Sequence, residues 1–107
     1  MSWRDESTAL KGLVTDSDIY TKKMNKLKSV PVLYIDDFLK GGFTEADLKL
    51  AFEVLNARYN DTKLRTIISS EMSIKKLISI DEALGGRIYE RSRGRIINTP
   101  DSNWRIQ

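Results

Sequence analysis

The chain has 107 residues, of which 40% are hydrophobic and 31% are charged, and its formal net charge is +3. This composition is typical of one globular domain, and so small a charge does not by itself indicate a nucleic-acid partner. The absence of cysteine and histidine excludes disulfides, Cys/His zinc sites, a cysteine nucleophile and a histidine base. No apolar stretch reaches the roughly 20 residues of a membrane span. We therefore expect a cytoplasmic protein without a membrane partner.

The first part of the chain predicts two helices and a strand. Residues 5–14 and 17–28 have the spacing of short helices, and the second carries Ile19, Met24 and Leu27 on its apolar side. Residues 30–36, V-P-V-L-Y-I-D, are nearly all apolar. Such a run is typical of a strand that is covered on both faces.

The second part predicts a longer helix and then shorter elements. Thr44-Glu-Ala-Asp47 resembles a capping box, and the helix after it has apolar positions at Leu48, Ala51, Phe52, Leu55 and Tyr59. Residues 65–70 are a second buried-type strand, Ser73 and Asp81 are caps of two helices that reach 78 and about 91, and 95–98 is a final short strand. Strands that alternate with helices indicate a parallel sheet, so the expected fold class is α/β in a single domain spanning 1–107.

Polar residues follow two of the predicted strands. Asp36 and Asp37 end the first strand, and Ser69 and Ser70 end the second. Ligands of open parallel sheets lie beyond the carboxyl ends of the strands, and two carboxylates there suit a hard cation such as Mg²⁺. A hydrophobic strand that delivers an aspartate to a nucleotide's metal is the Walker-B arrangement. The alternative is that the two aspartates cap the loop into the next helix.

Several segments together resemble the bacterial and phage helicase loaders, a family of AAA+ ATPases. V-L-Y-I-D-D-F at 32–38 resembles a Walker-B strand, and F-E-V-L-N-A-R-Y at 52–59 resembles the helix that follows it. T-I-I-S-S-E at 66–71 resembles the sensor-1 strand, and I-D-E-A-L-G-G-R-I-Y-E-R at 80–91 resembles the arginine-finger helix. The resemblance implies a partial AAA+ (P-loop NTPase-like) three-layer sandwich.

The same resemblance implies roles for the polar residues at the strand ends. Asp36 matches the metal-coordinating position, and Asp37 matches the catalytic acidic position, where many members carry glutamate. Ser69 or Ser70 would approach the γ-phosphate of a nucleotide. Glu71 stands where many loaders have asparagine.

Arginines near the end of the chain match a surface that the family uses between subunits. Arg91 matches the arginine finger, Arg87 and Arg93 are its neighbours, and Arg105 resembles the late sensor-2 arginine. The spacing alone, without the family resemblance, places Arg87 and Arg91 four residues apart on one face of the predicted helix. Basic residues there also fit a solvated helix end, where the helix dipole favours positive charge.

The phosphate-binding loop of such an ATPase is not found in the sequence. Its pattern is G-x-x-x-x-G-K-[ST], and no glycine of the chain is followed by Lys and then Ser or Thr in that frame: Gly12, Gly41, Gly42, Gly85, Gly86 and Gly94. In the family, the P-loop strand precedes the Walker-B strand with one strand between them, and residues 1–3 resemble the end of that intervening strand. We therefore expect no ATPase activity from these residues alone and no cofactor of their own.

These features predict an inhibitor of loader assembly. In the family, one subunit's P-loop face receives the next subunit's arginine finger, and such a head-to-tail contact continues until it is blocked. The chain resembles a short phage-encoded type of loader inhibitor. We expect it to bind the AAA+ domain of a bacterial helicase loader in the host cytoplasm, to block loader self-assembly and to inhibit host DNA replication. Any ATP or ADP at the joint would be held by the partner, with weak or no nucleic-acid binding.

The alternative is a truncated loader that binds single-stranded DNA or the replicative helicase. Basic and aromatic residues that could follow a single strand are Lys22, Lys23, Lys26, Lys28, the arginines of 87–95, Tyr20, Tyr89 and Trp104. Lysines spread around a helix are, however, usually its solvated side. Steep salt dependence would favour DNA binding. A third reading is an ATPase fragment that needs a missing half.

Overall fold

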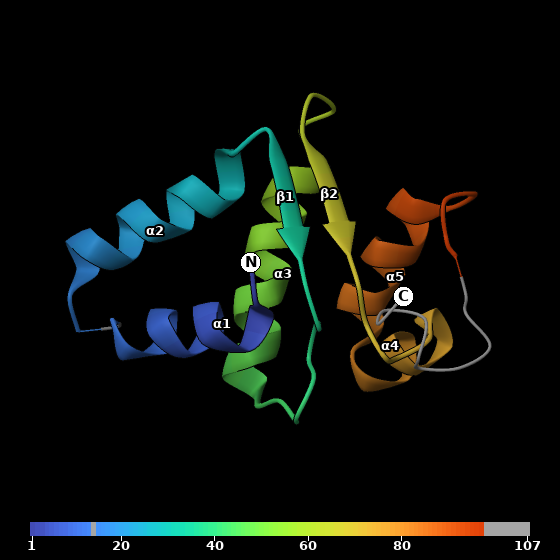
Figure 1. Ribbon diagram of the computed structural model, residues 1–107, viewed down its shortest axis with the longest axis horizontal. Helices are drawn as coiled ribbons and strands as arrows, with labels where there is room; N and C mark the ends of the chain where they lie inside the picture. Colours follow the sequence, from blue (N-terminus) through green and yellow to red (C-terminus); the bar gives the residue numbers. More distant parts are fainter. Residues whose placement is uncertain (14, 98–107) are drawn as a thin grey trace. The chain divides into compact units, whose positions relative to one another are not determined.

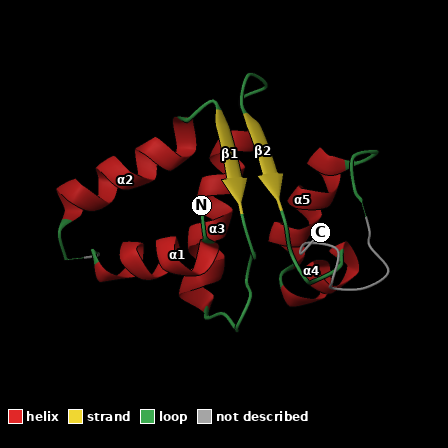
Figure 2. Cartoon of the chain, in the orientation of Figure 1, coloured by secondary structure: helices red, strands yellow, loops and turns green. Residues whose placement is uncertain are grey.

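The computed structural model describes residues 1–13 and 15–97. The chain forms two compact units, Met1–Ser70 and Glu71–Gln107. The elements in chain order are α1 (Trp3–Gly12), α2 (Ser17–Ser29), β1 (Val32–Ile35), α3 (Glu45–Tyr59), β2 (Arg65–Ile68), α4 (Ile74–Ile80) and α5 (Glu82–Ser92) (Figures 1 and 2). The α/β class expected from the sequence is confirmed. None of the described helices has both the length and the apolar character needed to cross a membrane.

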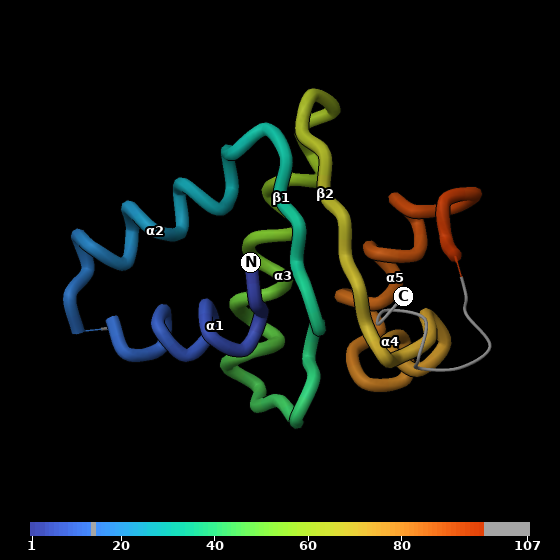
Figure 3. Tube along the Cα trace, viewed as in Figure 1, coloured from blue at the N-terminus to red at the C-terminus, as the bar shows by residue number. Residues whose placement is uncertain are grey.

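The two strands of the first unit form a parallel sheet, as the sequence predicts. Val32 lies opposite Arg65, and Ile35 lies opposite Ile68. The first residues of the chain run beside the end of β1, on the side away from β2 (Figure 3). There the Asp36 N–H donates to the Met1 carbonyl at 2.8 Å, and the Trp3 N–H donates to the Asp36 carbonyl at 3.1 Å. A short segment therefore extends the sheet at the point where the aspartate pair begins.

The core of the first unit lies between the sheet and the helices. Figure 1 shows α3 behind the two strands, and both α1 and α2 contact α3. Leu33 and Ile35 of β1 are buried. The Trp3 indole packs edge-on against Phe38, with ring centroids 5.1 Å apart and an interplanar angle of 71°. The N-terminal turn of α1 is thereby fixed to the loop that follows β1.

The outer face of the sheet is exposed, which corrects the expectation of strands covered on both faces. Side chains alternate along β1, so that Val32 is 62% and Tyr34 45% exposed. In β2, Ile67 is 51% exposed and its neighbours Thr66 and Ile68 are half-buried. An unbroken apolar run is typical of a strand with two covered faces. In the described structure it serves one covered face and one open apolar face.

The buried side of α3 differs from the expected stripe. The buried residues are Asp47, Leu50, Ala51, Val54, Leu55 and Arg58. Leu48, Phe52 and Tyr59, which the sequence placed on the apolar side, are only half-buried. The prediction is confirmed for Ala51 and Leu55 and wrong for the other three positions, because it followed apolar residues, whereas the buried face includes an acid and an arginine. The capping box is confirmed, since Thr44 Oγ1 accepts from the Asp47 N–H and Asp47 Oδ2 accepts from the Thr44 N–H at 2.8 Å.

Within the second unit, the described residues 71–97 form a pair of short helices. Their caps are as predicted: Ser73 Oγ accepts from the Lys76 N–H at 3.1 Å, and Asp81 Oδ1 accepts from the Leu84 N–H at 3.0 Å. At Gly85 the helices approach closely, because a Cβ there would lie 2.5 Å from the backbone nitrogen of Ile78. The final strand expected at 95–98 is not formed by residues 95–97, and Asn98 lies outside the described residues.

Candidate functional site

The polar residues that follow the two strands meet at one edge of the sheet, as predicted. The Ser69 hydroxyl donates to Asp36 Oδ1 at 2.7 Å, and the same hydroxyl oxygen accepts from the Asp37 N–H at 3.1 Å. The Ser70 hydroxyl donates to the Phe38 carbonyl at 3.2 Å. Ser69 thus positions the carboxylate of Asp36, while Ser70 supports the loop behind it.

The loop after β1 holds two residues in the left-handed backbone region. Asp37 has φ 54° and Leu39 has φ 60°. This conformation costs roughly 1–2 kcal/mol for most residues and is easier for aspartate than for leucine. Leu39 is 1% exposed, so burial of its side chain offsets the cost. The backbone beside the aspartate pair is therefore held in a conformation that packing imposes.

The carboxylates of the described residues do not form a ready metal cage. No group of three or more His, Cys, Asp or Glu side chains that could hold a metal is present in residues 1–13 and 15–97. Asp36 is exposed and Asp37 is half-buried, and the carboxylate of Asp36 is already bonded to Ser69. The role of this pair in metal chemistry stays a prediction.

The predicted arginines lie on and just after α5. Arg87 is half-buried, whereas Arg91 and Arg93 are exposed. Among the residues that the structure describes, none of the three guanidinium groups has a hydrogen-bond acceptor or an ion-pair partner. Arg105 lies outside the described residues. These arginines belong to the second unit.

The lysines of α2 are divided between solvent and the protein. Lys22, Lys23 and Lys26 are exposed, but Lys28 forms an ion pair with Glu53 of α3 at 2.9 Å. One of the four lysines considered for DNA binding therefore already has a carboxylate partner. The remaining three fit the solvated side of a helix.

A buried arginine that sequence reasoning missed ties the first unit together. Arg58 is 1% exposed, and its guanidinium donates to Thr66 Oγ1 and to the carbonyls of Leu27, Val30 and Arg65 at 2.7–2.9 Å. Burial lowers the pKa of Arg58, and the effects of Tyr59 and Asp61 partly offset this. The available signal was its spacing, because residue 58 follows Val54 and Leu55 by four and three positions on one helical face.

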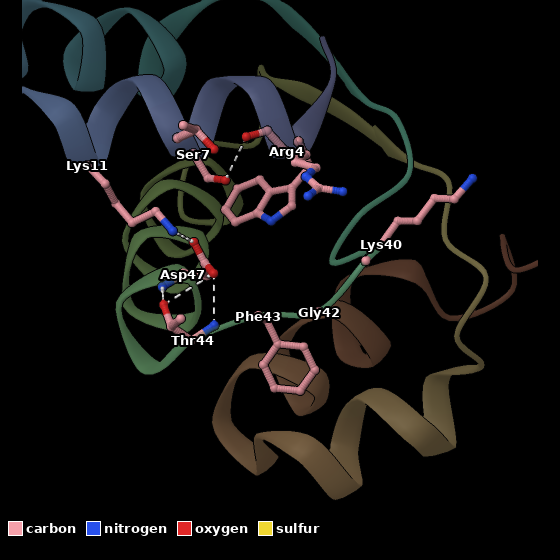
Figure 4. A pocket seen from close by; sticks show the side chains of 11 residues that line it. Arg4, Ser7, Lys11, Lys40, Gly42, Phe43, Thr44 and Asp47 are labelled. Carbon is pink, nitrogen blue, oxygen red and sulfur yellow. Dashed lines mark hydrogen bonds and ion pairs between the residues drawn. The ribbon is translucent and has the colours of Figure 1, made fainter.

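A pocket of about 300 Å³ lies between α1 and the loop at 40–44 (Figure 4). Figure 4 shows Lys11 of α1 reaching Asp47 of α3, with Lys11 Nζ 2.8 Å from Asp47 Oδ1. Burial acts to raise the pKa of Asp47, but the hydrogen bonds from Lys11 and Thr44 outweigh it, and the pKa lies below its ordinary value. Trp3, Arg4 and Lys40 also line this pocket. Sequence reasoning did not bring these residues together, because they come from segments far apart in the chain.

The chain is similar in sequence to two proteins of Bacillus subtilis, one of which is named as a protein of a phage-like element. It is 40% identical over 83 residues to the phage-like element PBSX protein XkdC of Bacillus subtilis (strain 168), covering 73% of this chain and 31% of that protein. It is 36% identical over 90 residues to the uncharacterized protein YqaM of the same strain, covering 79% of this chain and 28% of that protein. The chain thus spans less than a third of the length of either relative. No family model and no solved structure matches it.

Proposed function

We propose that this chain binds the ATPase domain of a bacterial AAA+ helicase loader and blocks the loader's self-assembly, without hydrolysing ATP itself. The proposal continues the resemblance of the Walker-B, sensor-1 and arginine-finger segments. Similarity to a protein of a phage-like element supports a phage origin. In this proposal the effect on the host is inhibition of DNA replication.

The observation that carries the proposal is the arrangement of arginines on α5. Arg87 and Arg91 lie one turn apart, and neither guanidinium has an acceptor in the part of the chain that the structure describes. A guanidinium offers five donors suited to phosphate or carboxylate. Such a pair can serve a partner's nucleotide or an acidic side chain, and charge-assisted contacts of this kind are the strong ones.

The edge of the sheet supports the same reading. The resemblance implies that the Walker-B aspartate and the sensor-1 residue are neighbours, and the hydrogen bond between Ser69 and Asp36 makes them so. The sequence contains no P-loop pattern to hold a nucleotide against them. The proposal therefore assigns the chain a binding role, in which the partner supplies any nucleotide.

The test measures the binding of this chain to a purified bacterial helicase loader by calorimetry and by size exclusion. The unmodified chain is compared with Arg91→Ala, Arg87→Ala and the control Lys75→Ala, which removes an exposed charge from α4 of the same unit. Each arginine variant is expected to weaken binding by about tenfold or more, or about 1.4 kcal/mol. The control is expected to bind like the unmodified chain, and the unmodified chain to reduce the loader's oligomer peak.

A different pattern would contradict the proposal. If no complex forms, or if the arginine variants bind as tightly as the Lys75→Ala control, the α5 surface is not the binding surface. A complex with single-stranded DNA whose affinity falls steeply with salt would instead support the alternative function. Repeating the loader titration with ADP and with a non-hydrolysable ATP analogue shows whether the contact depends on the partner's nucleotide.

A further inference from the structure

The outer face of the sheet carries apolar side chains at its centre. Val32 and Tyr34 of β1 are 62% and 45% exposed, and Ile67 of β2 is 51% exposed. Tyr34 lies beside Ile67 in the register of the two strands. The side chain of Thr66 points to the opposite face, where it accepts from the buried Arg58 of α3. The apolar side chains therefore face away from α3, and exposed apolar groups with a polar rim mark interaction surfaces.

The same face carries opposite charges at its two ends. Arg65 begins β2 beside Val32, and its side chain is exposed. Asp36 follows Tyr34 by two positions, so its side chain lies on the same face, and it is also exposed. The Ser69 hydroxyl donates to the Asp36 carboxylate at 2.7 Å. The outer face thus has a guanidinium where the strands begin, apolar side chains in the middle and a carboxylate where the strands end.

This order of charges is complementary to itself when a second copy is turned end for end. A two-fold axis that crosses the strands at Tyr34 and Ile67 places the start of each strand over the end of the same strand in the other copy. Arg65 of one copy then faces Ser69 and Asp36 of the other, and the symmetry of such an interface makes this contact twice. Near the axis, each Tyr34 ring meets its counterpart, and aromatic pairs are favourable when they stack with an offset.

The donors of Arg65 are sufficient for such a contact. One of its nitrogens donates to the Thr62 carbonyl at 3.2 Å, and a guanidinium has five N–H donors. Packed sheets lie about 10 Å apart, a gap that is filled by side chains from both copies. If the second copy were instead placed with its strands parallel, the two arginines would lie at the same end of the interface. The antiparallel arrangement is therefore the one that the charges favour.

We propose that the outer face of the sheet binds a second copy of this chain, with the two sheets face to face and their strands antiparallel. Each strand has four residues, so at about 3.3 Å per residue the face extends only about 13 Å along the strands. It is smaller than the roughly 800 Å² that each partner of a stable complex buries. We therefore expect a weak, reversible dimer that is mostly dissociated at low micromolar concentration. This surface belongs to the first unit and does not rest on the proposed loader contact.

Sedimentation equilibrium of the full chain, from low micromolar to millimolar concentration, tests the proposal at low ionic strength, where exposed charges are least screened. A reversible monomer–dimer equilibrium is expected. Arg65→Glu brings like charges together at both contacts and is expected to raise the dissociation constant by about tenfold or more. Asp36→Arg is expected to do the same. A mixture of the two variants is expected to associate again, because every contact in the mixed dimer joins opposite charges.

The control Lys22→Glu makes the same change of charge at an exposed position of α2 and is expected to associate like the unmodified chain. Circular dichroism establishes that each variant is folded. A chain that stays monomeric throughout overturns the proposal, and so does an Arg65→Glu variant that associates as tightly as Lys22→Glu. If both charge-reversal variants are folded and their mixture stays dissociated, the antiparallel arrangement is wrong. If Asp36→Arg does not fold, because the carboxylate also accepts from Ser69, the comparison of Arg65→Glu with Lys22→Glu decides.

Discussion

At the residue scale, Arg58 shows how a charge is kept inside the first unit by hydrogen bonds to uncharged oxygen atoms. Its donors are directed at one hydroxyl and three carbonyl oxygens, which belong to the end of α2, the segment before β1 and the start of β2. A buried charge is tolerated only when its hydrogen bonds are made. The guanidinium fork makes four bonds at once, because its donors lie in one rigid plane.

We expect Arg58→Met to destabilise the protein by about 3 kcal/mol or more, because three carbonyls and a hydroxyl lose their donor inside the protein. Urea unfolding followed by circular dichroism measures this loss. Arg58→Lys keeps the charge but cannot reach the same four acceptors, so it is expected to lose most of the same stability. The control Arg65→Lys, at an exposed side chain, is expected to change the unfolding free energy by less than about 0.5 kcal/mol. Equal stability of Arg58→Lys and the unmodified chain would show that the fork geometry is unimportant.

The lowered pKa of Asp47 predicts that the stability of the folded protein decreases in acid. Its pKa is lowered in the folded state, so the folded protein prefers the ionised carboxylate more than the unfolded chain does. The resulting stability is fully present above the unfolded value of about 3.9, and is lost as pH falls through the lower folded value. Unfolding free energies measured between pH 7 and pH 2.5 are expected to show this decrease.

The matched variants separate the charge of Asp47 from its role as a cap. Asp47→Asn retains an oxygen that can accept from the Thr44 N–H but carries no charge for Lys11. We expect it to lose the acid-dependent part of the stability and to keep most of the cap. Asp47→Ala loses both and is expected to be about 1 kcal/mol less stable again. An unchanged pH profile in Asp47→Asn would assign the acid sensitivity to other groups.

At the scale of elements, the close approach of α4 and α5 depends on one of two adjacent glycines. A Cβ at Gly85 would lie 2.5–2.7 Å from backbone atoms of Ile78 and Leu77, whereas one at Gly86 would have nothing within 4 Å. We expect Gly85→Ala to force the helices apart and to destabilise this unit by about 1–3 kcal/mol or more. Gly86→Ala is expected to be neutral or to stabilise α5 by up to about 1 kcal/mol.

Hydrogen exchange of the amides in residues 71–97 measures how each glycine substitution changes the stability of this unit. Faster exchange in Gly85→Ala together with unchanged or slower exchange in Gly86→Ala is the expected result. If the two variants exchange alike, the close approach of the helices does not limit the stability of this unit. The comparison also bears on loader binding, because the same helix carries Arg87 and Arg91.

The elements themselves could largely be predicted from sequence, because their signals are local. The caps at Thr44, Ser73 and Asp81 were found from the pattern of polar residues at helix starts, and the parallel sheet was found from the alternation of elements. The meeting of Asp36 with Ser69 followed from the rule that parallel strands end at one edge. Each of these depends on near neighbours or on topology.

What could not be predicted depends on contacts between distant segments. The apolar run of β1 does not indicate how many faces of the strand are covered. The sequence of α3 does not reveal that Arg58 is buried, because the acceptors of its guanidinium lie up to 31 positions away. The pocket beside Trp3 joins α1 to the loop after β1 and to the start of α3. A sequence pattern gives no position in space for such a combination.

At the scale of the molecule, the two-stranded sheet has one buried face and one exposed apolar face. Ile35 is 0% exposed and Ile67 is 51% exposed, although both lie in the same two-stranded sheet. We expect Ile35→Thr to lose about 2–4 kcal/mol of stability, since it places a hydroxyl in the core. Ile67→Thr is expected to stay within about 0.5 kcal/mol and to reduce concentration-dependent association, because it shrinks an exposed apolar patch.

Thermal unfolding and light scattering at several concentrations test this pair. A large loss of stability in Ile67→Thr would mean that the outer face is covered in solution.

The acceptors of Arg58 affect which positions of the sequence can be substituted during evolution. Three of the four are main-chain oxygens, which every amino acid carries. Replacements at positions 27, 30 and 65 can therefore accumulate without removing an acceptor, whereas position 58 itself has no substitute. A library randomised at these four positions and selected for folded protein should return arginine at 58 and varied residues at the exposed position 65.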